Sequence, residues 1–276
     1  MRQFTRTEIQ ERLRAHIEAK EPIVMGGAGI GLVAKVADQA GIDIIMAYNT
    51  GPFRMDGHPS LAGFLALADA NGIVLDLGRR ILPVVNDTPD VAAVLAGDPT
   101  RDMGYLITEM MNMGFSGITA GPMARVYTGK FLALIEEGNM GYAKEVELIR
   151  ICHERDIFTV AYVFSPEEAR EMTEAGADIV APHVYTTSGG MAGVKSVLSL
   201  EYACELTEAM CVAAREIRPD VILVSHGGPF KDPESVQYCF DHTTVHGYLG
   251  ASSVERIPIE NAITNVVKEY KALKLN

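Results

Sequence analysis

Apolar runs and helical patterns alternate along the whole chain. The apolar runs are mostly continuous, end in small or polar residues, and are each followed by a segment in which apolar positions recur at helical spacing. Continuous apolar runs are typical of parallel strands that are buried on both faces. The pattern predicts eight strand segments, some of which continue into a loop, at 22–31, 43–60, 91–99, 117–122, 158–165, 175–184, 222–230 and 245–260.

Helical segments are predicted after each strand. They cover 32–40, 61–70 with 73–85, 101–113, 129–156, a helix that begins at Pro166, 199–219, 232–243 and 258–273. One further helix, at 5–20, precedes the first strand. It has Ile9, Leu13 and Ile17 at helical spacing, and Thr5 near Glu8 is typical of a helix start.

Eight consecutive strand–helix units predict a single domain over residues 1–276, a (β/α)8 TIM barrel with residues 1–20 as an N-terminal capping helix. A length of 276 residues is near the usual size of this fold. An open doubly wound sheet is the alternative. Against it, 26-GGAGIG-31 matches the dinucleotide-binding fingerprint only loosely, so we expect no nucleotide cofactor.

Composition narrows the range of partners. The formal net charge is −12, so nucleic acid and anionic membranes, which need a basic face, are not expected. The N-terminus is charged throughout, and no run of about twenty apolar residues occurs, so neither a signal peptide nor a membrane span is expected. The cysteines form no C-x-x-C pair, which indicates reduced thiols in a cytoplasmic protein; they are Cys152, Cys204, Cys211 and Cys239.

Two loops near the end of the chain are rich in small residues. They lie in 222-ILVSHGGPF-230 and 245-VHGYLGASSVERIPIE-260, after the seventh and eighth predicted strands. In a (β/α)8 barrel this is the usual place for an anion site, and small residues let backbone N–H groups approach an anion. The alternative is that the glycines only form tight turns. The predicted anion-binding positions are Gly227, Gly228, Gly250, Ala251, Ser252 and Ser253.

Two histidines stand at the exits of neighbouring strands. His183 follows the sixth predicted strand and His226 ends the seventh, so both are expected to face one pocket. An imidazole can act as a general acid or base near neutral pH. The alternative is a structural hydrogen bond to a carbonyl group. Other candidate residues at strand exits are Gly26, Gly27, Tyr48, Asn49, Arg54, Asp98, Tyr162 and Arg256, the last of which is adjacent to Glu255 and could form an ion pair with it.

The sequence offers little for metal or nucleophilic chemistry. Zinc-binding spacings, a nucleophile elbow and a Walker A motif are all missing from the sequence. A Mg²⁺ ion held by Asp98 and water is compatible with the pattern, although an Asp-Pro pair is also a common turn opener.

Several long motifs resemble the phosphoenolpyruvate hydrolase-like TIM-barrel family, formerly called a TIM-barrel signal-transduction family. The same module resembles the C-terminal half of a plant tobamovirus-resistance protein. The resemblance covers nearly the whole chain, and it implies a TIM barrel, homo-oligomers and action on an acid of the phosphoenolpyruvate type. The motifs are 48-YNTGPFRMDGHPSLAGFLALADAN-71, 97-GDPTRDM-103, 136-EEGNMGYAKEVELI-149, 174-EAGADIVAPH-183, 186-TTSGG-190, 226-HGGP-229 and 250-GASSVERIPIE-260.

The resemblance carries over to particular positions. The family motifs fall on Tyr48–Met55, on His226–Pro229 and on Gly250–Arg256. The chain departs from the family pattern at 119-TAGPMAR-125, at 183-HVYTTSGG-190 and at 96-AGDP-99. These departures line the expected mouth of the barrel, so the identity of the substrate is the property they affect most.

The leading hypothesis is a lyase or hydrolase that acts on a small anionic oxo- or enol-acid. The loops after strands seven and eight would hold the anionic group with Arg54, and His226 or His183 would move the proton. Tyr48 and Asp98 would stabilise an enolate-like intermediate. The main alternative is a non-catalytic module that senses a small anion or binds another protein. A purely structural scaffold is the least favoured.

Overall fold

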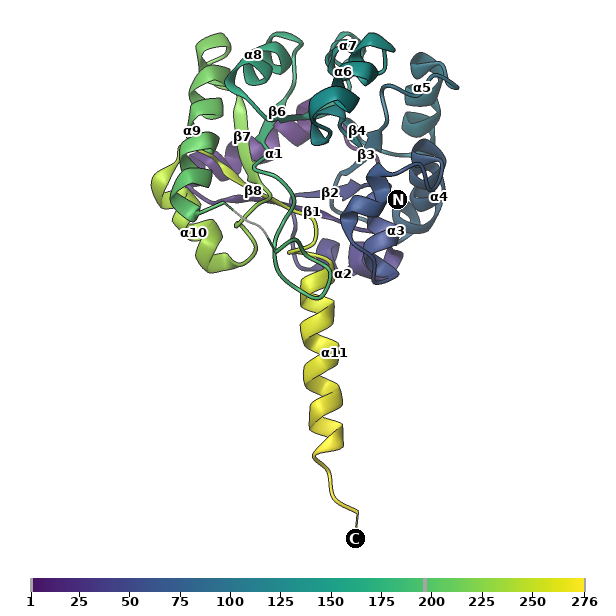
Figure 1. Ribbon diagram of the computed structural model, residues 1–276, viewed down its shortest axis with the longest axis vertical. Coiled ribbons are helices and arrows are strands. Elements are labelled where there is room, and N and C mark those ends of the chain that lie inside the picture. The colour runs from purple at the N-terminus through teal and green to yellow at the C-terminus, as the bar shows by residue number, and fades with distance from the viewer. Residues whose placement is uncertain (1, 196–197, 276) are drawn as a thin grey trace.

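The computed structural model describes residues 2–195 and 198–275, and its centre is a closed parallel barrel (Figure 1). The eight strands are hydrogen-bonded in chain order, and the last strand pairs with the first. The predicted (β/α)8 barrel is confirmed, and the open-sheet alternative is wrong. The strands are β1 (Ile23–Gly27), β2 (Ile44–Ala47), β3 (Asp90–Val94), β4 (Gly117–Ala120), β5 (Phe158–Val163), β6 (Ile179–Pro182), β7 (Ile222–His226) and β8 (Gly247–Gly250).

Most helices lie around the barrel as an outer layer (Figure 1). The α-helices are α1 (Arg6–Ala19), α2 (Gly31–Gln39), α3 (Thr50–Met55), α4 (Ala70–Ile81), α5 (Met103–Met113), α6 (Gly129–Glu137), α7 (Tyr142–Glu154), α8 (Pro166–Glu174), α9 (Leu200–Ile217), α10 (Pro233–His242) and α11 (Arg256–Lys271). The part of the chain that the structure describes also has short 3-10 helices, which are η1 (Ser60–Phe64), η2 (Leu82–Val84) and η3 (Ala124–Val126).

The segment after β2 differs from the prediction. Residues 50–55, expected in a loop, form α3, while the helix expected over 61–70 is only the 3-10 turn η1 followed by irregular chain. The Asp69 side chain accepts a hydrogen bond from the Gly72 N–H group and caps α4, so that helix begins only at Ala70. Gly63 packs so closely on α3 that a Cβ atom there would lie 2.5 Å from Thr50 Cγ2. Packing against α3 therefore replaces the helix that the sequence pattern favours.

The interior of the barrel is filled by side chains from the strands, and α1 covers its N-terminal end. Ile9 and Leu13 of α1 belong to the same buried cluster as Ile23, Phe158 and Ile222, which begin or nearly begin their strands. The Thr5–Glu8 capping box is present at the start of α1. Because this end is closed by apolar packing, the carboxyl ends of the strands are the open end of the barrel.

The last helix is an exception to the outer layer. After its first turn α11 leaves the body of the protein and projects outward, and the C-terminus lies beyond its tip (Figure 1). Residues 261–275 are all exposed. Among residues 2–195 and 198–275, no helix is both long enough and apolar enough to cross a membrane.

Asp90 is a buried carboxyl group at the start of β3, far from the open end. Burial, with a smaller effect from Asp38, raises the pKa of Asp90 to about 8. In the unfolded chain the same group ionises near 3.8, so between these two values the unfolded state has fewer bound protons than the folded state. Stability should therefore decrease as the pH rises through this window.

We predict that Asp90→Asn removes this decrease. Thermal unfolding of the two proteins between pH 4 and pH 8 should show equal melting temperatures at the acid end and a growing advantage for the variant toward pH 8. A melting-temperature difference that does not change with pH would contradict a protonated Asp90 in the folded protein.

Candidate active site

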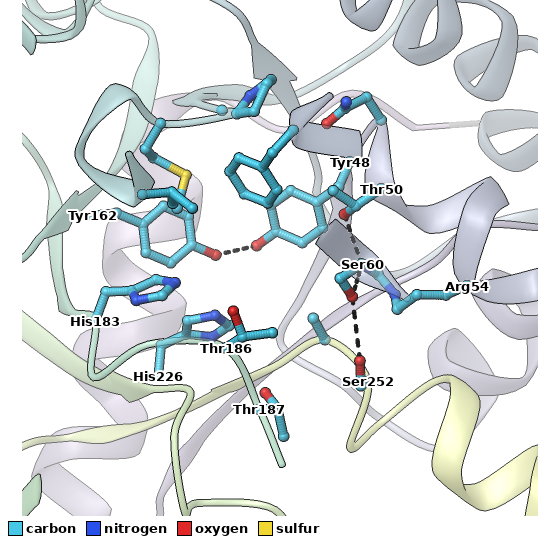
Figure 2. A pocket seen from close by; sticks show the side chains of 17 residues that line it. Tyr48, Thr50, Arg54, Ser60, Tyr162, His183, Thr186, Thr187, His226 and Ser252 are labelled. Carbon is cyan, nitrogen blue, oxygen red and sulfur yellow. Dashed lines mark hydrogen bonds between the residues drawn. The ribbon is translucent and has the colours of Figure 1, made fainter. Parts of the chain in front are cut away.

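A pocket lies at the carboxyl end of the barrel and receives residues from six strand exits (Figure 2). Its wall combines two imidazoles, two phenols and several hydroxyl groups with apolar side chains. The residues that line it are Tyr48, Asn49, Thr50, Arg54, Ser60, Phe64, Gly121, Pro122, Met123, Val126, Tyr162, His183, Thr186, Thr187, His226, Ala251 and Ser252.

The structure brings His183 and His226 together, as the sequence predicts. The two residues form an isolated parallel bridge between the ends of β6 and β7, and their ring centroids are 4.8 Å apart. The Val184 N–H group donates to the His226 carbonyl group at 3.0 Å, which fixes the register of the pair. Both side chains point into the pocket (Figure 2).

Backbone groups determine which ring nitrogen of each histidine has the proton. His226 Nδ1 lies 2.7 Å from the Leu249 carbonyl oxygen, which can only accept, so Nδ1 has the proton and Nε2 has a lone pair. His183 Nδ1 lies 3.0 Å from the Tyr185 N–H group, which can only donate, so the proton of neutral His183 is on Nε2. The pair thus offers one acceptor and one donor.

Both imidazoles are neutral at physiological pH. Burial is the main cause in each case. It lowers the pKa of His226 to about 4 and, with the neighbouring His226, holds the pKa of His183 well below its usual value. His226 Nε2 is therefore free to accept a proton, and His183 Nε2–H can donate a hydrogen bond.

A pair of phenols faces the two imidazoles. The hydroxyl groups of Tyr48 and Tyr162 form a short hydrogen bond across the pocket (Figure 2). The Tyr162 ring centroid is 5.7 Å from that of His183 and 5.1 Å from that of His226. Burial raises the pKa of both phenols above the ordinary value, so both keep their protons. The hydrogen bond between the two oxygens uses one of the two hydroxyl protons. The second hydroxyl proton can be donated to an oxygen atom of a ligand.

Arg54 forms a buried ion pair that the sequence did not predict. Its Nε donates to Glu255 Oε2 at 2.7 Å, and its NH1 donates to Thr50 Oγ1 at 2.6 Å. The side chains of Arg54 and Glu255 are 1% and 0% exposed. The suggested pairing of Glu255 with Arg256 is therefore wrong, because Arg256 pairs with Glu260 and donates to the Gly189 carbonyl group.

The pocket is consequently close to electrically neutral. Glu255 balances the charge of Arg54, and the two histidines are uncharged. Arg54 NH2 is buried without a hydrogen-bond partner, and Ser60, Ser252, Thr186 and Thr187 place hydroxyl groups along the wall. This arrangement suits one carboxylate that is bound by hydrogen bonds better than a group of higher charge.

Only part of the predicted anion site faces the pocket. Ala251 and Ser252 line it, but the Gly228 N–H group is used by the Tyr185 carbonyl group at 2.9 Å. The other predicted glycines pack against neighbouring chain, and Ser253 donates to or accepts from the Tyr248 hydroxyl group. The predicted residues outside the lining are Gly26, Gly27, Gly227, Gly228, Gly250, Ser253, Arg256 and Asp98.

Asp98 lies apart from the histidines and does not fit a magnesium ion. Partial desolvation acts against ionisation, but hydrogen bonds from Thr100, Asn71 and Arg101 hold the pKa of Asp98 well below its usual range. Its oxygens are thus already used, and the Arg101 cation would repel a metal. The pocket lining has no carboxylate, and the described part of the chain has no cluster of three metal-binding side chains. The residues present do not fit the Mg²⁺ ion suggested by the sequence.

Several pocket residues were missed because they are not at strand exits. Ser60 and Phe64 come from η1, and Thr186 and Thr187 lie in the loop after β6. Tyr162 is at a predicted strand exit, but nothing in the sequence showed its contact with Tyr48. The only available signal for Glu255 was its place in 250-GASSVERIPIE-260, and the burial of the pair follows from the packing of α3 against the turn after β8.

Comparisons with known proteins identify the family. The model of the phosphoenolpyruvate hydrolase-like family matches residues 8–273. The chain belongs to this family. It is 42% identical over 271 residues to the ToMV resistance protein Tm-1(GCR237) of Solanum lycopersicum, a match that covers 98% of the chain and 36% of that protein. The chain therefore spans about a third of the length of this curated relative.

Solved structures share the fold of this family member. A phosphoenolpyruvate phosphomutase from Streptomyces platensis subsp. rosaceus matches with a TM-score of 0.61 at 14% identity, covering 95% of this chain and 86% of the other. A phosphonopyruvate hydrolase in complex with oxalate and Mg²⁺ matches with a TM-score of 0.57 at 19% identity, covering 95% and 84%. At these identities the similarity shows the barrel fold.

We predict that Glu255→Gln destabilises the protein strongly. The substitution leaves the buried Arg54 charge without its partner, which costs about 3–5 kcal/mol for a buried pair. Glu147→Gln is the matched control, because the Glu147–Arg150 pair is about half exposed and should cost less than about 1 kcal/mol. Urea unfolding measures both, and equal small losses would contradict the structural role of the buried pair.

Proposed function

We propose that this protein is a lyase or hydrolase that acts on a small 2-oxo- or enol-acid of the phosphoenolpyruvate type by acid–base chemistry at the mouth of the barrel. The observation that supports it is the complementary state of the two imidazoles. His226 presents a lone pair and His183 presents an N–H group, 4.8 Å apart between ring centroids. A base that can activate water, beside a donor that can stabilise an enolate oxygen, is what hydrolytic cleavage next to a carbonyl group requires.

In the proposed hydrolysis His226 Nε2 takes a proton from a water molecule, whose oxygen attacks the substituent on the carbon next to the carbonyl group. The bond between that carbon and the substituent breaks, its electron pair moves toward the carbonyl oxygen to form an enolate, and the substituent leaves with the hydroxyl group of the water. His183 Nε2–H and the Tyr48–Tyr162 pair donate hydrogen bonds to the carbonyl oxygen as its negative charge develops. The proton then passes from His226 to the enolate carbon, which gives the 2-oxo-acid product. Arg54 NH2 and the nearby hydroxyl groups hold the carboxylate. Asp98 has no role in this scheme, because its carboxylate is used elsewhere.

The comparisons support the class of substrate. The two structural relatives are named for phosphoenolpyruvate and phosphonopyruvate, and one of them is a complex with the small acid oxalate. Magnesium is named for one relative, but the neutral and carboxylate-free lining of this pocket gives a metal no ligand set, and no step is assigned to one. The four buried, unpaired cysteines fit a reducing compartment, so we place the protein in the cytoplasm.

A second candidate is a module that binds a small anion without converting it. The name of the tomato relative describes virus resistance and not a reaction, and this observation favours the alternative. The two candidates differ in one measurable property. Incubation with phosphonopyruvate or oxaloacetate, followed by mass spectrometry, yields product if the protein is an enzyme and only bound ligand if it is a sensor.

We also propose that the chain forms homo-oligomers through α11. One face of this helix is apolar, with Ile263, Val266, Val267 and Tyr270 at helical spacing. All four side chains are exposed to solvent. A barrel normally has a helix over each strand pair, but α11 projects and does not cover β8 and β1 (Figure 1). There the apolar residues Val24, Leu32 and Val36 remain exposed. The α11 helix of a second copy supplies the covering helix.

We predict that His226→Gln lowers turnover at least about 100-fold, because glutamine cannot accept the proton. Proton NMR in D₂O, with oxaloacetate or phosphonopyruvate as substrate, measures cleavage and solvent exchange. His242 is exposed on α10, so the control His242→Gln should show wild-type rates in this assay.

The pH dependence gives a second check on His226. In the wild-type enzyme kcat/KM should fall as the pH is lowered through about 4, where His226 becomes protonated. A normal rate in His226→Gln would remove this residue from the mechanism.

We predict that Val267→Asp converts the oligomer to a monomer, because it places a charge in the apolar face of α11. Asn265→Asp adds the same charge to the opposite face and should leave the mass unchanged. Size-exclusion chromatography with light scattering measures both variants. A wild-type chain that is already monomeric at micromolar concentration would contradict association through α11.

A further inference from the structure

A second cleft lies beside the mouth pocket, at the exits of β3 and β4. Phe64 and Pro122 line both cavities and form their common wall. The segment after η1 covers the cleft on one side, and α6 and α7 close the other. The residues that line it are Gly63, Phe64, Leu65, Ala66, Ala68, Ala70, Leu95, Gly97, Pro99, Thr100, Pro122, Ala124, Tyr127, Ile135, Met140 and Glu145.

The chemistry of the cleft differs from that of the mouth. Its lining includes no basic side chain and is mostly apolar, with Leu65, Leu95, Ile135 and Met140 as its larger aliphatic side chains. Leu65 and Met140 are 60% and 40% exposed, so an apolar ligand that covered them would remove a substantial apolar surface from water. An anionic group would find no cationic side chain there.

One polar side chain in the cleft has an unused oxygen atom. Glu145 of α7 is 3% exposed, and its Oε1 accepts a hydrogen bond from the Ala124 N–H group at 2.7 Å. Its Oε2 is buried and has no hydrogen-bond partner. The nearby Arg125 does not supply one, because its Nε lies 2.7 Å from Glu168 Oε1 and its guanidinium group lies over the Tyr142 ring. Burial raises the pKa of Glu145 to about 8, so the group is mostly a neutral acid at pH 7.

A buried polar atom without a partner is costly, and a ligand group is one way to satisfy it. A neutral carboxylic acid can donate to a carbonyl or hydroxyl oxygen and can accept from a hydroxyl group. The partner expected at Glu145 is therefore an uncharged oxygen group at the end of an apolar chain or ring.

We infer that this cleft is a second compartment of the same active site, which holds an apolar alkyl or aryl extension of the substrate and binds its terminal hydroxyl or carbonyl group through Glu145. The inference rests on the proposed function, since the 2-oxo-acid end of the substrate occupies the mouth. It makes the substrate class an oxo-acid with an aryl or longer alkyl side chain. Phe64 lines both cavities, so a substrate that extends from the mouth into the cleft would lie against its side chain.

The segment that separates the two compartments is held from both sides. Asn49 Nδ2 donates to the Gly63 carbonyl group at 2.7 Å, and the Tyr127 hydroxyl group donates to the Phe64 carbonyl group. Asn49 lines the mouth and Tyr127 lines the cleft. A substrate that spans both compartments would therefore contact Asn49 at one end and Tyr127 at the other, and both of these residues hold the Gly63–Phe64 segment in place.

The test compares the affinities of pyruvate, phenylpyruvate and 4-hydroxyphenylpyruvate by titration calorimetry. Phenylpyruvate should bind at least about tenfold more tightly than pyruvate, because its ring is buried in the cleft. The 4-hydroxy compound should bind more tightly again, through Glu145.

Ala70→Leu fills the cleft from a buried position and should abolish the preference for the ring while leaving pyruvate binding within about twofold. Ala62→Leu, at a residue that lines neither cavity, should change nothing.

Glu145 is tested separately with two substitutions of similar length. Glu145→Met removes the hydrogen bond and should abolish the advantage of the 4-hydroxy compound over phenylpyruvate, whereas Glu145→Gln retains a donor and an acceptor and should preserve it. Equal affinity of wild-type protein for pyruvate and phenylpyruvate would overturn the inference and leave the proposed function standing. Failure of all three acids to bind would contradict both.

Discussion

The mouth of the barrel depends on the buried ion pair between Arg54 and Glu255. It joins the segment after β2 to the turn after β8, and Glu255 Oε1 also accepts a hydrogen bond from the Gly29 N–H group at 2.5 Å. Three consecutive loops around the closure of the barrel are thereby tied to one carboxylate. The loops after β1 and β2 approach each other so closely that a Cβ atom on Gly29 would lie 2.3 Å from the Gly51 backbone. Loss of either charge would leave the other buried without a partner.

This pair also determines the electrostatics of the site. Because Glu255 neutralises Arg54, the mouth has no net charge to attract an anion, and the groups it offers for the proposed ligand are one guanidinium nitrogen, hydroxyl groups and an imidazole. In such a desolvated pocket a positioned donor is worth more than in water. Neutral histidines are consistent with this environment, since burial disfavours the imidazolium form of both.

The turn after β8 connects the site to the proposed association of two copies. Glu255 is the residue before α11, and residues 251–255 contribute Ala251 and Ser252 to the pocket. A second copy that holds α11 would restrain this turn, and with it the carboxylate that binds Arg54. The apolar cleft at the exits of β3 and β4 is on a different part of the same rim, so the proposed substrate extension and the proposed association of chains would use separate surfaces.

The sequence by itself determined the barrel, because continuous apolar runs and helical periodicity report local burial directly. It also placed His183 and His226 at one mouth, because neighbouring parallel strands end at the same edge. It could not show that α3 forms in a loop-like segment, that Asp98 is held by Asn71, or that Glu255 pairs with Arg54, since each depends on contacts between segments distant in the chain. The protonation pattern of the two imidazoles was likewise decided only in three dimensions. The backbone groups of Leu249 and Tyr185 set it, and only the folded backbone brings a carbonyl oxygen to one ring and an N–H group to the other.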